Sequence, residues 1–261
     1  MTREQTNKRT GTYLYAVVSG LPDTDLGPIG LHDSQVYAVT ITDGGGDLKA
    51  VVSDVPTSEE LRPERKNLAA HQRVLRKVIE SSRSTLPVSF GTVADSADGV
   101  RDLLTRHHGD LTEQVHRVEG KVQMAARTYY KDAQPNVFEF FVSRNPDLAQ
   151  MRDRLAGSGR VPTRDEKIEL GQAFEEALNR AREKYGRALE RELQSCCTEV
   201  KRYPPADERE IVRLTCLIPK ERQREFEESL DRAAQELPQE FLVEQNGPYP
   251  PYDFVGLHLT V

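Results

Sequence analysis

Apolar and polar positions along the first part of the chain predict three β-strands. Short, mostly apolar runs rich in β-branched and aromatic residues occupy 13–18, 36–41 and 48–52, which is typical of buried strands. The segment 43–47 between the last two runs contains three consecutive glycines. Because glycine adopts positive φ without steric cost, we expect a hairpin turn there. The three glycines do not form a phosphate-binding loop of the Walker type, because the Gly-Lys-Ser/Thr ending of such a loop is missing.

The pattern then switches to helical spacing and back. Residues 63–81 place apolar side chains three and four positions apart, on one face of a helix. A strand at 86–90, a helix capped by Asp95, a short helix opening with 110–113 and a strand at 122–130 follow. The order β-β-β-α-β-α-β predicts a ferredoxin-like α/β sandwich with an added strand. We expect its helices over one face of a largely antiparallel sheet.

Turn-forming residues at both ends of 135–146 indicate a domain boundary. The expected division is a disordered tail at 1–11, an N-terminal ferredoxin-like domain at 12–133 and a C-terminal domain at 134–261. The boundary contains an apolar cluster at 137–142. We favour buried packing between the domains for this cluster over an exposed docking patch.

The C-terminal domain begins with helices. After a helical segment at 147–155, Thr163 and Glu166 form a capping-box sequence that opens a helix running to about Ser195. This length exceeds that of an ordinary globular helix. Its outer end therefore either projects or pairs with the preceding helix as an antiparallel hairpin. Two acid–base pairs at i,i+4 spacing are expected on its polar side, Glu176 with Arg180 and Glu183 with Arg187.

The last part of the chain predicts a second small α/β sandwich. A largely alternating strand at 212–218 is ended by Pro219, which suits the first turn of a helix to about Glu236. Apolar runs at 241–244 and 255–261 predict two final strands. The expected fold class is therefore α+β with two domains. The second is a modified ferredoxin-like domain with a long helix or helical hairpin.

Composition and charge narrow the function classes. The 261 residues include 36 Lys and Arg against 42 Asp and Glu, a formal charge of −6, which argues against a nucleic-acid partner. No apolar run approaches the roughly 20 residues that span a bilayer, and the polar start does not resemble a secretory signal. Three cysteines, two of them adjacent, fit a reducing cytosol better than a disulfide framework. We expect a cytoplasmic protein with no membrane partner.

Candidate catalytic and metal-binding residues are few. His71 lies on an apolar helix face, where a hydrogen-bonded core histidine is favoured over a ligand or general base. The adjacent His107 and His108 point about 100° apart on a helix, and we place them at its C-terminus, where positive charge is favoured. The vicinal Cys196 and Cys197 lack a Cys-x-x-Cys partner, so a structural role is favoured over soft-metal binding. We expect no catalytic residue, no metal and no cofactor.

Two separated motifs resemble those of the gas vesicle protein family GvpF/GvpL. They are Leu-Pro-x-x-Phe-Gly-Thr at 86–92 and Gly-Pro-x-Pro-Pro-Tyr-x-Phe at 247–254. The opening strand at 13–18 and the segment 167–171 add to a resemblance that covers about 12–258. The residues that carry the two motifs are Leu86, Pro87, Phe90, Gly91, Thr92, Gly247, Pro248, Pro250, Pro251, Tyr252 and Phe254.

We interpret the motif residues as scaffold rather than as direct binding groups. Pro87 cannot donate to a strand ladder, so it suits an edge strand or a strand start. The proline-rich segment 248–251 is a stiff connector that Tyr252 and Phe254 can pin onto the core. The family commonly carries Trp where Tyr249 stands, which leaves an F-like or an L-like member equally open.

The resemblance implies a non-enzymatic accessory protein that gas vesicle assembly requires. It would be a minor shell component or a chaperone-like factor that binds the major shell protein GvpA, with other gas vesicle accessory proteins as further partners. It would work in the cytoplasm, in association with the gas vesicle. The alternative is a small-molecule-binding enzyme or regulator on tandem ferredoxin-like domains, with His71, His107 or His116 lining a pocket.

Overall fold

The chain divides into two compact units in its computed structural model. The first unit comprises 1–123 together with 248–261, and the second unit comprises 124–247. The residues that the structure describes are 10–22, 25–40, 47–57, 61–131 and 136–256. Some sequence-based expectations fall wholly or partly outside them, namely the tail 1–11, the turn 43–47, the start of the boundary 135–146 and the strand 255–261. Val255 and Gly256, the described part of that last segment, are not in a strand.

Antiparallel strands form the sheet of the first unit, in the order β2-β3-β1-β4 with β5 also paired to β1. They are β1 (Thr10–Ser19), β2 (Val36–Thr40), β3 (Leu48–Pro56), β4 (Ser84–Pro87) and β5 (Val93–Ala94). The register of β1 against β3 shifts between Leu14 and Ala16, where a β-bulge inserts one extra residue. Because of this shift, Tyr13, Tyr15 and Ala16 all contribute to the same core.

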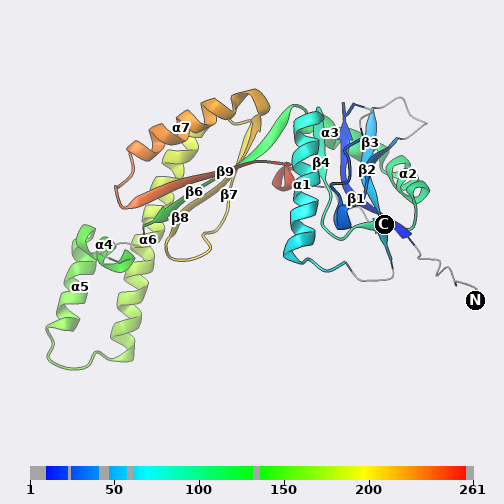
Figure 1. Cartoon of the computed structure of the whole chain (residues 1–261). Helices are drawn as coiled ribbons and strands as arrows, with labels where there is room; N and C mark the ends of the chain where they lie inside the picture. Colours follow the sequence, from blue (N-terminus) through cyan, green and yellow to red (C-terminus); the bar gives the residue numbers. More distant parts are fainter. Residues whose placement is uncertain (1–9, 23–24, 41–46, 58–60, 132–135, 257–261) are drawn as a thin grey trace, which may run out of the picture. The chain divides into compact units, whose positions relative to one another are not determined.

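Helices cover both faces of the first sheet, and the expectation of helices over one face is wrong. Helix α1 (Arg65–Ser81) packs on the side of Tyr13 and Tyr15. Helices α2 (Ala97–Arg106) and α3 (His108–Arg117) pack on the side of Leu14, and Figure 1 shows α1 and α2 on opposite sides of the strands. The reason is visible in β1 and β3, whose apolar runs do not alternate with polar residues, so that both faces require cover.

Two helix boundaries of the first unit also differ from the sequence-based expectation. The cap of α2 is Ser96, whose hydroxyl accepts a hydrogen bond from the Gly99 N–H at 3.1 Å, and not Asp95. Helix α3 begins at His108, two residues before the predicted capping sequence. His108 thus lies at a helix N-terminus, and its placement at a C-terminus is wrong. Apolar spacing identifies the buried face of a helix but fixes its ends poorly.

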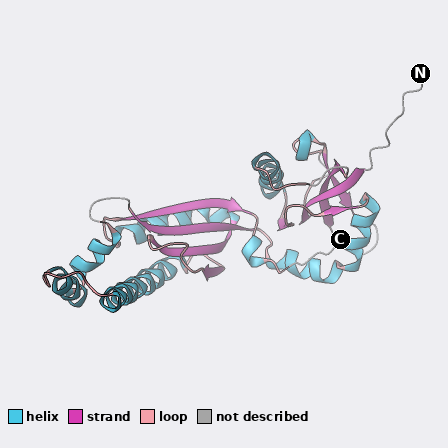
Figure 2. Ribbon diagram, turned by 90° about the horizontal axis from the view of Figure 1, so that it is seen from below, coloured by secondary structure: helices cyan, strands magenta, loops and turns pink. Residues whose placement is uncertain are grey.

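The sheet of the second unit has the order β7-β8-β6-β9, and Figure 2 shows its strands side by side in one layer. The strands are β6 (Lys121–Tyr130), β7 (Glu199–Arg202), β8 (Glu210–Pro219) and β9 (Phe241–Tyr249). Helix α7 (Gln223–Gln235), which follows a 3-10 turn at Lys220–Arg222, packs against β8 and against the long helix α6 (Arg164–Leu193). Its buried side chains include the expected Phe226, Leu230 and Ala233.

In the described part of the second unit, three helices precede β7. Helices α4 (Val137–Arg144) and α5 (Pro146–Ala156) both pack against α6, so the hairpin interpretation of the long helix is confirmed (Figure 1). Thr163 and Glu166 form the predicted capping box. The apolar cluster 137–142 is buried inside this unit rather than between domains: the rings of Phe140 and Tyr130 are 5.0 Å apart.

The units differ from the expected division of the chain in two places. The first unit ends at Gln123, inside β6, and the rest of β6 belongs to the second sheet. The segment 248–261 belongs to the first unit although the second unit precedes it in the sequence. The α+β class with two antiparallel sheets is confirmed.

Candidate functional site

The two separated motifs meet at His71, which lies on α1 and is 1% exposed. The hydroxyl of Tyr13 on β1 is 2.9 Å from His71 Nδ1. The hydroxyl of Tyr252, from the C-terminal motif, is 3.3 Å from His71 Nε2. Phe90, from the first motif, contacts the imidazole edge-on with ring centroids 5.8 Å apart. Together with Tyr15, which stacks on the imidazole at 5.6 Å, these residues form what we call the His71 cluster.

The two ring nitrogens of His71 and the hydroxyl groups of Tyr13, Tyr15 and Tyr252 all have hydrogen-bond partners. A neutral imidazole carries one donor and one acceptor, and the two tyrosine hydroxyls satisfy both in either tautomer. The Tyr13 hydroxyl also accepts from the Gly91 N–H at 3.1 Å. The Tyr15 hydroxyl accepts from the Leu31 N–H at 2.8 Å and bonds Ser53 Oγ at 2.9 Å. Pairing of this kind is what permits polar groups in a packed core.

Burial controls ionisation throughout the cluster. It lowers the pKa of His71 to about 4, so the imidazole is neutral near pH 7. It raises the pKa of Tyr13, and it raises that of Tyr252 to about 12. A neutral histidine between neutral phenols is suited to holding segments together. Because its two nitrogens are occupied and its surface is covered, it is poorly placed to act as a general base.

The first motif shapes the loop that leaves β4. Leu86 is fully buried, and Pro87 ends β4, which is an edge strand of the sheet. Gly91 has φ +94°, in the region that side chains strongly disfavour, and this turn aims its N–H at Tyr13. The Thr92 hydroxyl donates to the Ser89 carbonyl at 3.0 Å, and the Thr92 carbonyl accepts from the Leu14 N–H at 3.0 Å. The loop is thus fastened to β1 by main-chain bonds.

The second motif fastens the C-terminal segment to the first unit. Past Gly247 and Pro248, the side chains of Pro250 and Pro251 are buried. A 3-10 turn at Tyr252–Phe254 then buries Phe254 almost completely.

A second pair of bonds holds this turn in place. Gln123 Nε2 donates to Asp253 Oδ2 at 2.8 Å, and the Asp253 N–H donates to Gln123 Oε1 at 2.9 Å. Sequence reasoning missed Tyr13, Tyr15, Gln123 and Asp253 as members of this arrangement. The available signal was the pair of phenols in an apolar strand, since a buried hydroxyl requires a partner.

Among the described residues, no contact joins His116 or the cysteines to the His71 cluster. His116 on α3 is largely exposed and lies 3.6 Å from the Glu119 carboxylate. Cys196 and Cys197 have sulfurs 3.8 Å apart, and burial raises the pKa of Cys196 to about 12, which keeps it an unreactive thiol. Among the described residues, no three His, Cys, Asp or Glu side chains are grouped so as to hold a metal ion. Every helix in the described part is too short or too polar to span a lipid bilayer.

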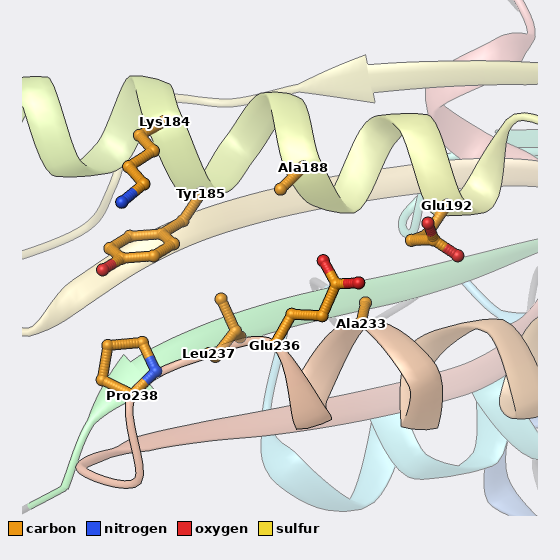
Figure 3. A pocket seen from close by; sticks show the side chains of 8 residues that line it. All are labelled: Lys184, Tyr185, Ala188, Glu192, Ala233, Glu236, Leu237 and Pro238. Atoms are coloured by element: carbon orange, nitrogen blue, oxygen red, sulfur yellow. The ribbon is translucent and has the colours of Figure 1, made fainter.

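A hollow of about 370 Å³ lies between α6 and α7 in the second unit. Figure 3 shows side chains from the two helices pointing toward one another across it. Its apolar floor is flanked by the carboxylates of Glu192 and Glu236 and by the Lys184 ammonium. The other lining residues are Tyr185, Ala188, Ala233, Leu237 and Pro238. This hollow contains no histidine, and neither do the hollows of about 290 and 410 Å³ elsewhere in the unit.

Solved structures with a similar fold are known. The chain matches the crystal structures of the gas vesicle protein GvpF from Anabaena sp. PCC7120 and from Microcystis aeruginosa, with TM-scores of 0.81 and 0.76. Each is 24% identical in sequence, and each match covers 95% of this chain and 99% of the other.

Proteins with related sequences are also named as gas vesicle proteins. "Gas vesicle protein F" of Streptomyces sp. (strain CB03234) is 28% identical over 212 residues, which are 80% of this chain and 85% of the relative. "Gas vesicle protein L" of the same strain is 26% identical and covers 81% of each chain. A family model described as "Gas vesicle synthesis protein GvpL/GvpF" matches residues 11–256, and that description names no catalysed reaction. The resemblance carried by the two motifs is confirmed: the chain belongs to the GvpL/GvpF family of gas vesicle synthesis proteins.

Proposed function

We propose that this chain is a non-enzymatic accessory protein of gas vesicle assembly that binds the major shell protein GvpA in the cytoplasm. The single observation that carries the proposal is the family match over residues 11–256. The proposal has two forms, in which the chain is either a chaperone-like factor or a minor shell component. Other gas vesicle accessory proteins are further partners in both. Gas vesicle association follows from the family; GvpA binding is the finer step that experiment must test.

A physical need supports a binding partner for the shell subunit. A wall that keeps water out of a gas space must present an apolar face to the gas. Before assembly, that face exposes a large apolar patch to water, which is an aggregation hazard. A highly charged protein such as this one, with 30% charged residues, can keep an apolar partner in solution.

The second unit offers the surfaces for such binding. The hollow between α6 and α7 has an apolar floor and a charged rim (Figure 3). Strand β9 ends its sheet and leaves an edge available for strand addition. The motif residues of the His71 cluster are proposed as scaffold, because their side chains are engaged with one another.

The rival function, a small-molecule enzyme or regulator, receives less support from the geometry. It required His71, His107 or His116 to line a pocket. His71 is 1% exposed and hydrogen-bonded at both ring nitrogens. His116 is largely exposed on a helix surface.

Co-expression with GvpA tests the proposal. An affinity-tagged form of this chain should retain GvpA in the supernatant and through purification at micromolar concentration. The matched control is an unrelated acidic protein with the same tag. Absence of association at that concentration contradicts the proposal.

A second measurement separates the two forms of the proposal. Intact vesicles are isolated, washed in high salt and probed for the chain. Retention after washing indicates a minor shell component. Complete loss, together with GvpA binding in the supernatant, indicates a chaperone-like factor that leaves after delivery.

A further inference from the structure

Strand β9 presents an unusually open edge. It is the last strand in the order β7-β8-β6-β9, and no described strand pairs with its outer side. In an antiparallel edge strand, every second residue directs its N–H and C=O away from the sheet. Natural edges are usually protected by short length, by proline or by several charges. β9 has nine residues, its first seven contain no proline, and Glu244 is their only charged side chain.

Helix α7, which packs against β8, also lines a groove together with β9. A hollow of about 290 Å³ lies between them, with Phe241, Leu242, Val243 and Gln245 from β9 on one side. Leu230, Asp231 and Ala234 of α7 form the other side. An edge strand flanked by a helix is the arrangement in which an extended peptide adds to a sheet by main-chain bonds and places alternate side chains in a pocket. This volume lies at the lower limit of small-molecule sites, which measure roughly 300–1,000 Å³.

The negative charge of the groove indicates which side chains a bound strand should carry. Asp231 is the only charged residue among those that line the hollow. Glu244 lies on β9, and its carboxylate also interacts with the Arg127 guanidinium of β6. Asp231 and Glu244 are both exposed. The rest of the lining is apolar apart from Gln245, and Leu242 is 43% exposed. A basic side chain beside aliphatic ones therefore complements the groove, whereas an acidic one is repelled.

We propose that the groove between α7 and β9 binds an extended strand of a partner protein, with alternate aliphatic side chains and a basic residue beside them. The partner strand pairs with the outer edge of β9 and places its aliphatic side chains against Leu230, Ala234 and Val243. This inference deepens the proposed function, and it rests on that function for the natural source of the strand. It goes further because it names one surface, the groove between α7 and β9, and one kind of ligand, an extended strand with aliphatic and basic side chains.

A peptide assay with the full chain tests the groove directly. The probe is the fluorescein-labelled peptide Lys-Val-Thr-Val-Lys-Val-Thr-Val amide, and binding is followed by fluorescence anisotropy. Ala234→Arg fills the groove from α7, and Gln235→Arg adds the same charge at the next, exposed position of the helix. We expect Ala234→Arg to weaken binding at least tenfold and Gln235→Arg to change it less than twofold. Replacing both lysines of the peptide by glutamate should weaken binding at least fivefold.

Several outcomes overturn the inference. Equal binding by Ala234→Arg and the unmodified chain does so, and so does equal binding of the lysine and glutamate peptides. A dimer in sedimentation velocity that Ala234→Arg dissociates assigns the groove to a second copy of this chain instead. Circular dichroism of both variants checks that the fold is retained. If Ala234→Arg is misfolded, Leu242→Lys on the exposed side of β9 takes its place with the same expected loss.

The same variants separate this inference from the proposed function. If the unmodified chain and Ala234→Arg retain GvpA equally, the groove inference fails and the proposed function stands. If neither retains GvpA, the proposed function fails, and the peptide assay alone decides on the groove.

Discussion

His71 makes the stability of the first unit depend on pH in a defined direction. Burial lowers the pKa of its imidazole from 6.5 to about 4. Above pH 6.5 the ring is neutral in the folded and the unfolded chain, and its contribution to stability is fully present. As the pH falls from 6.5 toward 4, the unfolded chain takes up a proton that the folded chain does not, so stability is lost.

The surroundings of His71 do not oppose this shift. The titratable groups that face it are the phenols of Tyr13 and Tyr15 on β1 and of Tyr252 in the C-terminal turn. Burial raises the pKa of each phenol, so all three stay neutral below pH 7. One pKa unit corresponds to about 1.4 kcal/mol, so the expected loss between pH 7.5 and pH 4.5 is about 2.5 kcal/mol.

A paired measurement isolates the contribution of His71. The full chain and the His71→Gln variant are compared at both pH values, with exchange of the β1 amides as a local probe of the first unit. The Gln side chain does not titrate, so the variant should lack about 2.5 kcal/mol of the pH-dependent loss, whatever its stability at pH 7.5. An NMR titration of the imidazole should give a midpoint near 4. A midpoint at 6 or above, or equal losses for the two proteins, refutes the reasoning.

Two further substitutions test how the motifs act. Tyr252→Phe removes the bond to His71 Nε2 and should cost the first unit about 1 kcal/mol in urea unfolding, while Tyr249→Phe, on the exposed end of β9, should be neutral. Gly91→Ala should cost about 1–3 kcal/mol, because its φ is +94° although a Cβ there meets no atom within 4 Å. Gly171→Ala, in the exposed part of α6, should instead stabilise that helix by about 0.5–1 kcal/mol, and the same sign for both glycines would contradict this account.

Local signals in the sequence were sufficient where a feature depends on neighbours in the chain. The capping box of Thr163 and Glu166 fixed the start of α6 within one residue. The i,i+4 pair of Glu176 and Arg180 forms at 3.7 Å. These features need only residues within one or two helical turns.

Features that depend on distant residues could not be predicted in the same way. The alternation of β6 identifies a strand, but its own residues do not say whether its neighbours are β1 or β8. His71 was expected to be a hydrogen-bonded core residue, and the structure places it so. Its second partner, Tyr252, lies 181 residues away, and no local pattern connects the two. The continuous apolar runs of β1 and β3 did contain the information that both faces of the first sheet are covered.

The return of the C-terminal segment to the first unit has a consequence for synthesis on the ribosome. The second unit is encoded between residues 123 and 248, so it emerges before Tyr252 and Phe254 do. At roughly 5–20 residues per second, translation from Gly91 to Tyr252 takes about 8–30 s. For that interval His71 lacks one hydrogen-bond partner and the core beneath Phe254 is uncovered. The unit that leaves the ribosome first is therefore the last to be completed.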